Sequence, residues 1–362
     1  MLKTVHIKNF RGFESFELQN LGRINLLVGK NNSGKTSVLE AIQLLHSGLN
    51  LEPLTEIMLN RGEFVWNERE PSQRELDLNC LFYGYKPEDN KITISGTKDN
   101  LQNKDIQKNT DFNAYLTWRS SPNTQNIPIL QKKVLSINHT QGQEAFIISD
   151  YNTLSLENLP YFPQPKDKPS QKTRFINSTS LTVGRMIDLF NEIVLNPEEL
   201  IVNEALKTIE PKLKRIAPVV PQTSHNLSNL RGGFVVRLAD SEQRIPIGSL
   251  GDGIWRMLGL ALSLASAKGG VLLVDEIDTG LHFTTLTDMW KLIWETAKKL
   301  DVQVFATTHS SDCWLSLATV ASQDDAVKKS VSIQRIEPHK KQAVAFTEEE
   351  IIIAAERGIE VR

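Results

Sequence analysis

The chain has 362 residues, enough for one large domain or two ordinary domains with well-buried cores. Its 41 Lys and Arg residues are balanced by 43 Asp and Glu residues, which excludes an overall basic field and limits any nucleic-acid surface to a local patch. The two cysteines, Cys80 and Cys313, are too few for a disulfide framework or a zinc site.

The sequence shows no sign of membrane insertion or secretion. Its most apolar stretch, residues 257–267, is far shorter than the roughly 20 residues that cross a bilayer. The N-terminus lacks a basic segment followed by an apolar core. Since two free cysteines also suit a reducing compartment, we expect a cytoplasmic protein with no membrane partner.

The first predicted elements are strands. Residues 4–10 and 13–18 alternate apolar and polar side chains, which predicts a short antiparallel ribbon. Residues 24–28 are continuously apolar and predict a buried strand.

A phosphate-binding loop follows this strand. Residues 29–36 read Gly-Lys-Asn-Asn-Ser-Gly-Lys-Thr, and residues 36–45 then carry apolar side chains at helical spacing. In such a loop backbone N–H groups cradle the phosphates, Lys35 reaches the terminal phosphates and the Thr36 hydroxyl coordinates Mg²⁺. A glycine turn with a chance Lys-Thr is disfavoured, because every fixed position and both flanks fit. The candidate nucleotide-binding residues of the loop are Gly29, Asn32, Ser33, Gly34, Lys35, Thr36 and Ser37.

The middle of the chain predicts a β-rich subdomain and then a helical lobe. The strand-like runs are residues 76–83, 91–95, 112–118, 134–137 and 145–149. Residues 160–171 contain four prolines and predict a connector. Residues 186–193 and 198–214 have helical spacing and predict the lobe.

The last third alternates strands and helices, which predicts a mostly parallel sheet covered by helices. The strands are residues 234–238, 271–274 and 302–307, and the helices are residues 253–267 and 284–300. We therefore divide the chain into an N-terminal part of a nucleotide-binding head at 1–165, a connector with the helical lobe at 166–229, and a C-terminal part of the head at 230–362.

Three polar residues follow two of these strands. Asp275 and Glu276 end an apolar strand, where open α/β sheets place their ligands. Asp275 would hold Mg²⁺, mostly through water, and Glu276 would orient the attacking water. An acidic pair alone could simply cap the strand, but the phosphate loop favours catalysis. His309 follows the next strand and could donate to the γ-phosphate.

A second anion site is predicted at the start of the helix 253–267. Ser249-Leu-Gly-Asp-Gly253 places a serine and two glycines at a helix N-terminus. Because the phosphate loop already serves the chain's own nucleotide, Ser249, Gly251, Asp252 and Gly253 would contact the ATP of a neighbouring copy. The alternative is an ordinary helix cap with a flexible loop.

Taken together, the motifs resemble ATP-binding-cassette ATPases of the SMC and RecF type, and most closely the RecF-like AAA-domain ATPases related to the overcoming-lysogenisation-defect (OLD) proteins. Residues 7–13 resemble the N-terminal strand and turn in which an arginine, here Arg11, approaches the nucleotide. Residues 249–256 resemble the divergent signature motif, residues 276–282 a catalytic glutamate and D-loop with Asp278, and residues 308–310 the switch histidine.

The resemblance implies an α/β P-loop NTPase fold, namely an ABC-type ATPase head with a mostly parallel core sheet, an antiparallel β subdomain and a helical lobe. It also implies ATP and Mg²⁺ as cofactors and a homodimer with two sandwiched ATPs. Strand patterns and prolines stand where SMC relatives insert a coiled coil. Asp324-Asp325 lacks the Asp-x-Asp spacing of the Toprim nuclease domain of OLD proteins, and Glu348 to Glu350 predict a solvated helix start, so we expect no nuclease activity. Gln131, Gln141 and Gln143 are equally poor candidates for a Q-loop.

These features favour an ATP-gated dimerisation switch that acts on an effector protein or DNA, in phage defence or DNA maintenance. A self-contained DNA-repair ATPase that binds DNA directly is the alternative, and a transport ATPase is disfavoured by the RecF-like opening. Most basic clusters are solvated faces, and Lys212, Lys214 and Arg215 in the helical lobe are the best candidates for contacts with a phosphate backbone.

Overall fold

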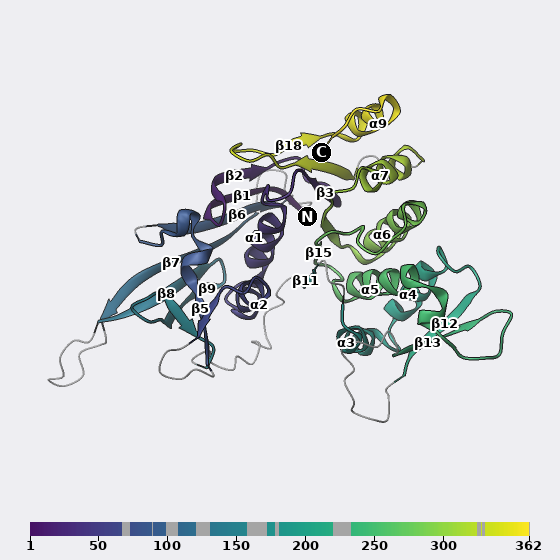
Figure 1. Cartoon of the computed structure of the whole chain (residues 1–362), viewed down its shortest axis with the longest axis horizontal. Coiled ribbons are helices and arrows are strands. Elements are labelled where there is room, and N and C mark those ends of the chain that lie inside the picture. Colours follow the sequence, from purple (N-terminus) through teal and green to yellow (C-terminus); the bar gives the residue numbers. More distant parts are fainter. Residues whose placement is uncertain are drawn as a thin grey trace. The chain divides into compact units, whose positions relative to one another are not determined.

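The computed structural model describes residues 1–66, 73–88, 90–98, 108–120, 131–157, 172–177, 181–219, 233–323, 327 and 330–361. The chain forms two compact units, which are described separately (Figure 1). Unit 1 comprises Met1–Asn20, Thr36–Ser170 and Pro338–Ala343, and unit 2 comprises Leu21–Lys35, Gln171–Glu337 and Val344–Arg362. The three-part division at residues 165 and 229 stays a prediction.

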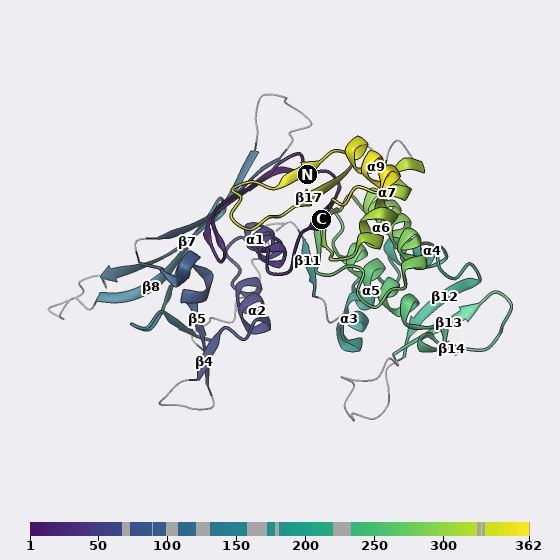
Figure 2. The ribbon, with the colours of Figure 1, turned by 45° about the horizontal axis from the view of Figure 1, so that its top comes forward.

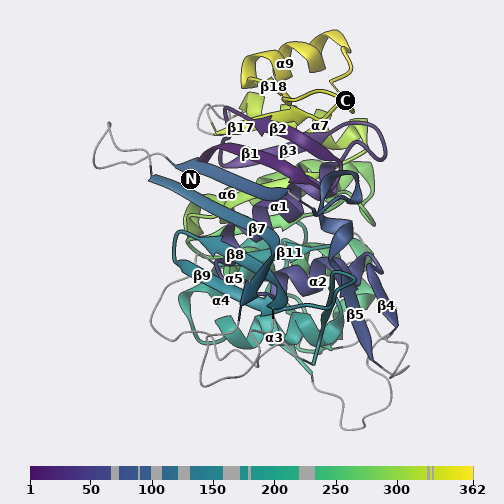
Figure 3. The same cartoon turned by 90° about the vertical axis from the view of Figure 1, so that its left-hand side faces the viewer.

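Unit 1 contains a six-stranded antiparallel sheet in the order β2-β1-β6-β7-β8-β9 (Figure 3). Val5 and Ile7 of β1 are buried while His6 is exposed, which confirms the predicted alternation. The predicted N-terminal ribbon is thus the edge of a larger sheet. The strands are β1 (Leu2–Phe10), β2 (Phe13–Leu18), β6 (Lys91–Lys98), β7 (Lys108–Ser120), β8 (Gln131–His139) and β9 (Gly142–Ile147).

Helix α1 (Lys35–Ser47) packs closely on this sheet. A Cβ added to Gly96 of β6 would lie 2.6 Å from Leu2 Cδ2 and 2.9 Å from Leu45 Cδ2. Glycine at this position therefore lets the helix and the strand approach. Helix α2 (Glu52–Asn60) follows, and Pro53 in its first turn suits a helix start.

A three-stranded antiparallel sheet completes the regular structure of unit 1. It is built from β4 (Phe64–Trp66), β5 (Arg74–Asp77) and β10 (Thr153–Ser155) in the order β10-β5-β4. The predicted strand over residues 76–83 is wrong beyond Asp77, because that side chain accepts a hydrogen bond from Asn79 N and begins the 3₁₀ helix η1 (Leu78–Leu81). Gly84 then has φ 65° inside η2 (Tyr83–Tyr85), which excludes an extended strand.

Unit 2 is built on a six-stranded sheet in the order β11-β15-β16-β3-β17-β18, in which only β18 is antiparallel to its neighbour. Every residue of β3, β15 and β16 is buried, as the continuous apolar runs predict. The mostly parallel core sheet is confirmed. The strands are β3 (Ile24–Val28), β11 (Thr173–Ile176), β15 (Val271–Val274), β16 (Gln303–Thr307), β17 (Val331–Arg335) and β18 (Val344–Phe346).

A row of helices packs beside this sheet within unit 2 (Figure 2). Helix α5 is almost entirely buried, and α6 contributes Trp290, the largest fully buried side chain. Thr347 and Glu350 form a capping box at the start of α9, which agrees with the predicted helix start. The helices are α3 (Val183–Ile193), α4 (Pro197–Leu206), α5 (Asp252–Ser266), α6 (Leu286–Leu300), α7 (Ser311–Gln323) and α9 (Glu348–Arg357), with the 3₁₀ helix η5 (Phe283–Thr285) before α6.

The predicted helix over residues 198–214 is wrong in its second half. Helix α4 ends at Leu206, and β12 (Leu213–Pro218) pairs with β13 (Phe234–Leu238) in an antiparallel sheet that β14 (Ile245–Pro246) completes. Pro211 explains the break, because a proline inside a helix removes a backbone donor and clashes with the preceding turn. The lobe is therefore helical and β-stranded.

Both cysteine thiols resist ionisation. Burial and the neighbouring Asp77 raise the pKa of Cys80 to about 11. Cys313 of α7 is fully buried, and burial raises its pKa as well. Among the residues that the structure describes, none of the helices combines the length and apolarity that crossing a membrane requires. The predicted connector at residues 160–171 lies outside the described residues.

Candidate nucleotide site

The loop between β3 and α1 has the backbone conformation of a phosphate cradle. Gly29, Asn32 and Gly34 have φ angles of 142°, 61° and 97°. A Cβ on Gly29 would lie 2.4 Å from Ile336 O, so only glycine fits there. Asparagine tolerates the left-handed region better than most residues. The loop thus needs its glycine for a steric reason that the sequence pattern alone does not reveal.

Lys35 is buried within this loop, with its side chain 5% exposed. Its Nζ donates hydrogen bonds to Gly29 O and Lys30 O, both at 2.9 Å. Burial lowers the pKa of Lys35, and the negative charges of Asp275 and Glu276 oppose that shift. The ammonium is therefore held by loop carbonyls, close enough to both carboxylates to feel their charge.

Ser33 supplies an unused polar group in the same loop. Its side chain is 6% exposed, and among the described residues its hydroxyl has no hydrogen-bond partner. A buried hydroxyl without a partner is uncommon, and a phosphate oxygen would satisfy it. Together with the glycine cradle and Lys35, it fits the loop to a phosphate group.

Asp275 follows β15, where the sequence analysis places it. Its Oδ1 accepts a hydrogen bond from Thr307 Oγ1 at 2.6 Å, and its backbone N donates to Ile176 O at 2.8 Å. The same Thr307 hydroxyl accepts a hydrogen bond from Glu276 N at 2.8 Å. Both acidic residues are thus tied to the end of the neighbouring strand β16.

Glu276 has a left-handed backbone, with φ 49°. Such a conformation is unfavourable for a residue with a Cβ and is typical of strained functional positions. Its Oε1 lies 3.7 Å from His309 Nε2, and its Oε2 accepts from Thr279 Oγ1 at 3.3 Å. The Glu276 and His309 side chains are 41% and 38% exposed, so solvent reaches both. The structure brings these two predicted residues together at one edge of the sheet.

Asp278 lies in the segment predicted to be the D-loop. Its Oδ1 accepts a hydrogen bond from Thr308 Oγ1 at 2.6 Å, and Thr308 is fully buried. The Thr308 hydroxyl also accepts from Ser310 N at 3.0 Å. The hydroxyl of Thr308 thus connects the turn around His309 with the predicted D-loop.

The predicted signature segment is exposed at the start of α5. It runs through the 3₁₀ helix η4 (Ile247–Leu250) and Gly251, whose φ is 94°. Ser249, Gly251 and Asp252 are exposed, and the N-cap residue of α5 is Gly251, which has no side chain to cap the helix. A Cβ on Gly253 would lie 3.9 Å from Leu281 Cδ2, so the signature segment is next to the D-loop.

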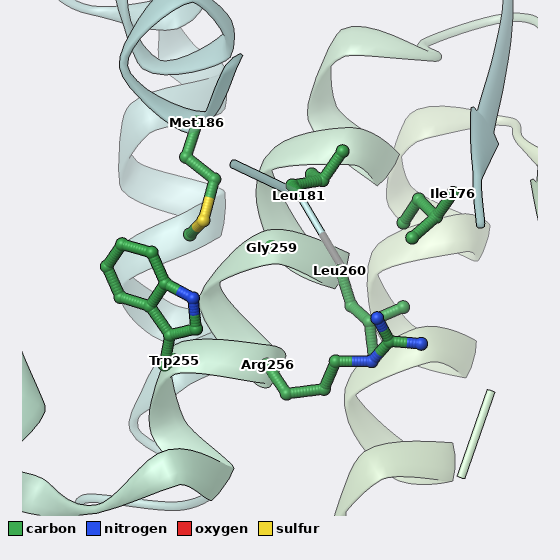
Figure 4. Close-up of a pocket in the computed structure, with 7 residues that line it drawn as sticks. All are labelled: Ile176, Leu181, Met186, Trp255, Arg256, Gly259 and Leu260. Atoms are coloured by element: carbon green, nitrogen blue, oxygen red, sulfur yellow. The ribbon is translucent and has the colours of Figure 1, made fainter. Parts of the chain in front are cut away.

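Arg256, one turn further along α5, connects this helix with Glu276. It is 6% exposed, and one of its terminal nitrogens donates to Glu276 O at 3.3 Å. Burial lowers its pKa, and Asp278 and Glu276 oppose the shift. In Figure 4 its side chain extends past Leu260 at a cavity of about 10 Å³. That volume has room for about one water and for no larger ligand.

Arg11 lies in unit 1, within an arginine–glutamate cluster formed by Arg11, Glu40, Arg61 and Glu63. Arg11 Nε is 2.6 Å from Glu40 Oε2, and its two terminal nitrogens donate to the Glu63 carboxylate at 2.5 and 3.0 Å. Arg61 Nε donates to Glu40 Oε1 at 2.6 Å. The guanidinium of Arg11 is therefore engaged by two carboxylates, and its contact with a nucleotide stays a prediction.

Thr36 and Ser37 open α1 after the loop. Thr36 is half-buried, and the buried Ser37 hydroxyl accepts a hydrogen bond from Arg61 at 3.4 Å. The roles of both hydroxyls toward Mg²⁺ and nucleotide stay predictions. Among the residues with described positions, no group of three or more His, Cys, Asp and Glu could hold a metal by itself, and Mg²⁺ sites that use substrate phosphates as ligands need no such cage.

The sequence analysis missed Thr307 as a site residue. The sequence signal for it is the pair Thr307 and Thr308, which follows an apolar run and directly precedes His309. It also missed the cluster around Arg11, because Glu40, Arg61 and Glu63 share no recognisable motif.

Comparison with known proteins decides the family. The family model of the AAA ATPase domain matches residues 1–313. The chain belongs to the AAA ATPase domain family. This ATPase is 24% identical over 335 residues to the ATP/GTP phosphatase of Helicobacter pylori, with 86% of each chain covered. It is 39% identical over 95 residues to the DNA replication and repair protein RecF of Salmonella paratyphi A, which covers 25% of this chain and 26% of the relative.

The fold of this AAA ATPase is that of an SMC head. The crystal structure of an SMC head bound to the C-terminal winged-helix domain of ScpA matches with a TM-score of 0.53 at 13% identity, covering 97% of this chain and 99% of the other. The predicted fold class, an ABC-type P-loop ATPase head, is confirmed. The protein is thus an ATPase with the fold of an SMC head, and about a quarter of its sequence is similar to RecF.

Proposed function

We propose that this ATPase is a nucleotide-gated dimerisation switch that acts on an effector protein or DNA, in phage defence or DNA maintenance. The observation that carries the proposal is the exposed signature segment. Ser249, Gly251 and Asp252 lie at a helix N-terminus whose N-cap residue is a glycine, next to the predicted D-loop. An exposed helix N-terminus favours an anion. Since the phosphate loop serves the chain's own nucleotide, the γ-phosphate of a second copy's ATP is the natural occupant.

Each chain would hold ATP and Mg²⁺ through its own loop. The fit rests on the glycine cradle, the partnerless Ser33 hydroxyl and the buried ammonium of Lys35. Thr36 and Asp275 would hold Mg²⁺, which supplies positive charge that offsets the charge developing on the phosphates. Lys35 would exchange its bonds to Gly29 O and Lys30 O for phosphate oxygens.

Glu276 would orient the attacking water, and His309 would donate to the terminal phosphate. Their 3.7 Å separation supports a shared role, because a water or phosphate oxygen could contact both side chains. Both are partly exposed, so closure by a second copy would exclude solvent from them. Hydrolysis would then remove the γ-phosphate that holds the two copies together.

The alternative is a DNA-repair ATPase that binds DNA directly. The cations predicted to contact DNA give this alternative weak support, because two of them already form ion pairs. Lys212 Nζ lies 2.7 Å from Asp240 Oδ2, and Arg215 lies 3.5 Å from Glu199 Oε1. Only Lys214 of the three cations lacks an ion pair among the described residues. Cations that are already paired release few counterions when a phosphate backbone binds.

The decisive experiment measures the mass of the protein in solution with and without ATP and Mg²⁺. Glu276→Gln should bind ATP, fail to hydrolyse it and accumulate as a dimer. Lys35→Ala should lose ATP binding by at least about 100-fold and stay monomeric. Gly251→Arg, which blocks the signature segment, should bind ATP and stay monomeric.

An ATP-loaded Glu276→Gln protein that remains monomeric would refute the dimerisation switch. Turnover that rises with DNA, together with DNA affinity that falls steeply as salt increases, would favour the direct DNA-repair ATPase. Turnover that ignores DNA, combined with a stoichiometric protein captured by Glu276→Gln, would favour an effector.

A further inference from the structure

We propose that Thr307 is a positioning residue that sets the geometry of Asp275 and Glu276 through one hydroxyl group. The inference rests on the roles proposed above for these two acids. Thr307 would contact neither nucleotide nor water itself, and it would act on hydrolysis through its two neighbours.

The backbone of Thr307 is fixed from both sides. It is the last residue of β16, which lies between β15 and β3, and it pairs with Leu27 of β3. Its carbonyl accepts a hydrogen bond from Ile277 N at 3.0 Å. Val274 pairs with Ala306, so the register places Thr307 opposite Asp275, the first residue beyond β15. The side chain is fully buried.

The hydroxyl of Thr307 is used in both directions. It has a single proton, which it donates to Asp275 Oδ1 at 2.6 Å. It accepts the backbone N–H of Glu276 at 2.8 Å. Because the donated proton fixes the orientation of the hydroxyl, a lone pair is left facing Glu276 N. One atom therefore links the carboxylate of Asp275 to the backbone of Glu276.

The link matters because Glu276 has φ 49°, a conformation that persists only where surrounding bonds hold it. Among the residues with described positions, two further groups bond to the Glu276 backbone. Thr279 N donates to Glu276 O at 3.0 Å, and Arg256 donates to the same oxygen at 3.3 Å. Thr307 is the described partner of Glu276 N, so loss of its hydroxyl would leave that N–H without this hydrogen bond and would release the carboxylate from its place beside His309.

Three variants separate positioning from packing. Thr307→Val keeps the shape and removes the hydroxyl, while Thr307→Ser keeps the hydroxyl. Thr296→Val is the control, since Thr296 is an equally buried threonine of α6 outside the site. Folding of each is checked by circular dichroism. If Thr307→Val fails to fold, Thr307→Cys replaces it, because a thiol has serine-like size and is a poor hydrogen-bond donor.

Thr307→Val should lower kcat about 10- to 100-fold, the range for residues that orient ligands or reacting groups indirectly. ATP affinity should change less than about threefold, because the phosphate loop is untouched, and the Mg²⁺ concentration for half-maximal turnover should rise. Thr307→Ser should stay within about threefold of wild type, and Thr296→Val should match wild type.

Hydrogen exchange supplies a readout that does not depend on turnover. Without nucleotide, the peptide that contains Glu276 should exchange faster in Thr307→Val and at the wild-type rate in Thr307→Ser. Wild-type kcat in Thr307→Val, or equal losses of ATP affinity and turnover, would overturn the proposal. A failure of the dimerisation switch is seen separately, as an ATP-loaded Glu276→Gln monomer, and leaves these comparisons readable.

Discussion

The arginine–glutamate cluster of unit 1 and the candidate nucleotide site of unit 2 bury charge in opposite ways. In the cluster, Arg11 and Arg61 both form ion pairs with Glu40, and Arg11 also donates a hydrogen bond to Glu63. In the site, the ammonium of Lys35 is held by backbone carbonyls, and Glu276 and His309 remain partly exposed. In the cluster the charged side chains form ion pairs with one another. In the site, the charged groups lie where a bound ligand could replace their present hydrogen-bond partners.

The difference indicates what each region does. Buried charges that form ion pairs with one another are costly to separate, so they suit a fixed structural joint between the β1–β2 turn and α1. A lysine bonded to neutral carbonyls can exchange those bonds for phosphate oxygens, which are stronger partners. The left-handed backbone of Glu276 is also typical of functional sites, where strained conformations are concentrated.

The largest effect should come from breaking the cluster. Glu40→Ala removes the carboxylate of a side chain that is 5% exposed and leaves Arg11 buried with one partner fewer. Loss of one partner of a buried pair costs about 3–5 kcal/mol, so the free energy of unfolding should fall by that amount. Denaturant unfolding followed by tryptophan fluorescence measures it.

Arg61→Ala is the graded control for this prediction. The Arg61 side chain is 35% exposed, so solvent can replace it and the loss should be about 1 kcal/mol. Equal losses for Glu40→Ala and Arg61→Ala would show that burial does not set the strength of the cluster.

An intermediate effect should follow from loosening the D-loop. Thr308→Val removes the hydrogen bond to Asp278 Oδ1, a bond to a charged group worth about 1.5–3 kcal/mol. If part of that energy orders the D-loop for a second copy, ATP-dependent dimerisation should weaken about tenfold while ATP binding by the monomer is unchanged. Light scattering over a concentration series in the Glu276→Gln background measures the first quantity. Unchanged dimerisation would separate Asp278 from the interface.

The smallest effect should be a loss of ATP affinity at alkaline pH, where Lys35 loses its proton. Burial lowers its pKa below the usual 10.5, and bound phosphates would raise it again. As the pH rises toward 10.5, Lys35 loses its proton in the free protein before it does so in the nucleotide complex. The affinity for ATP therefore falls, and binding takes up at most about one proton per site. Calorimetry at pH 9.5 in two buffers of different ionisation enthalpy should detect uptake, and at pH 7 it should detect none. Uptake of the same size at both pH values would assign the proton to another group.

The elements with strong local patterns could be predicted from the sequence. The core was predicted from the continuous apolar runs of β3, β15 and β16 and from the helical spacing of α5 and α6. The order of these elements predicted that Glu276 and His309 lie at the same edge of the sheet. Local patterns failed where a single residue overrode them, as Pro211 does after α4 and Asp77 does after β5.

The missed residues depend on contacts between distant parts of the chain. The hydroxyl of Thr307 acquires its two partners only when β16 pairs beside β15. Arg11 and Glu63 are 52 residues apart, and nothing in their local sequence indicates that they meet. β11 was missed as well, because four residues beside a proline-rich stretch carry little periodic signal.

The raised pKa values of the two native thiols make the protein suitable for site-specific labelling and spectroscopy. With a pKa of about 11, Cys80 is almost entirely protonated at pH 7, and the buried Cys313 is protected as well. Since maleimides react with thiolates, a cysteine introduced at the exposed Gln243, outside the predicted signature segment, would take a fluorophore far faster than either native one. A dye at that position would follow the approach of a second copy in real time, with both native cysteines left in place.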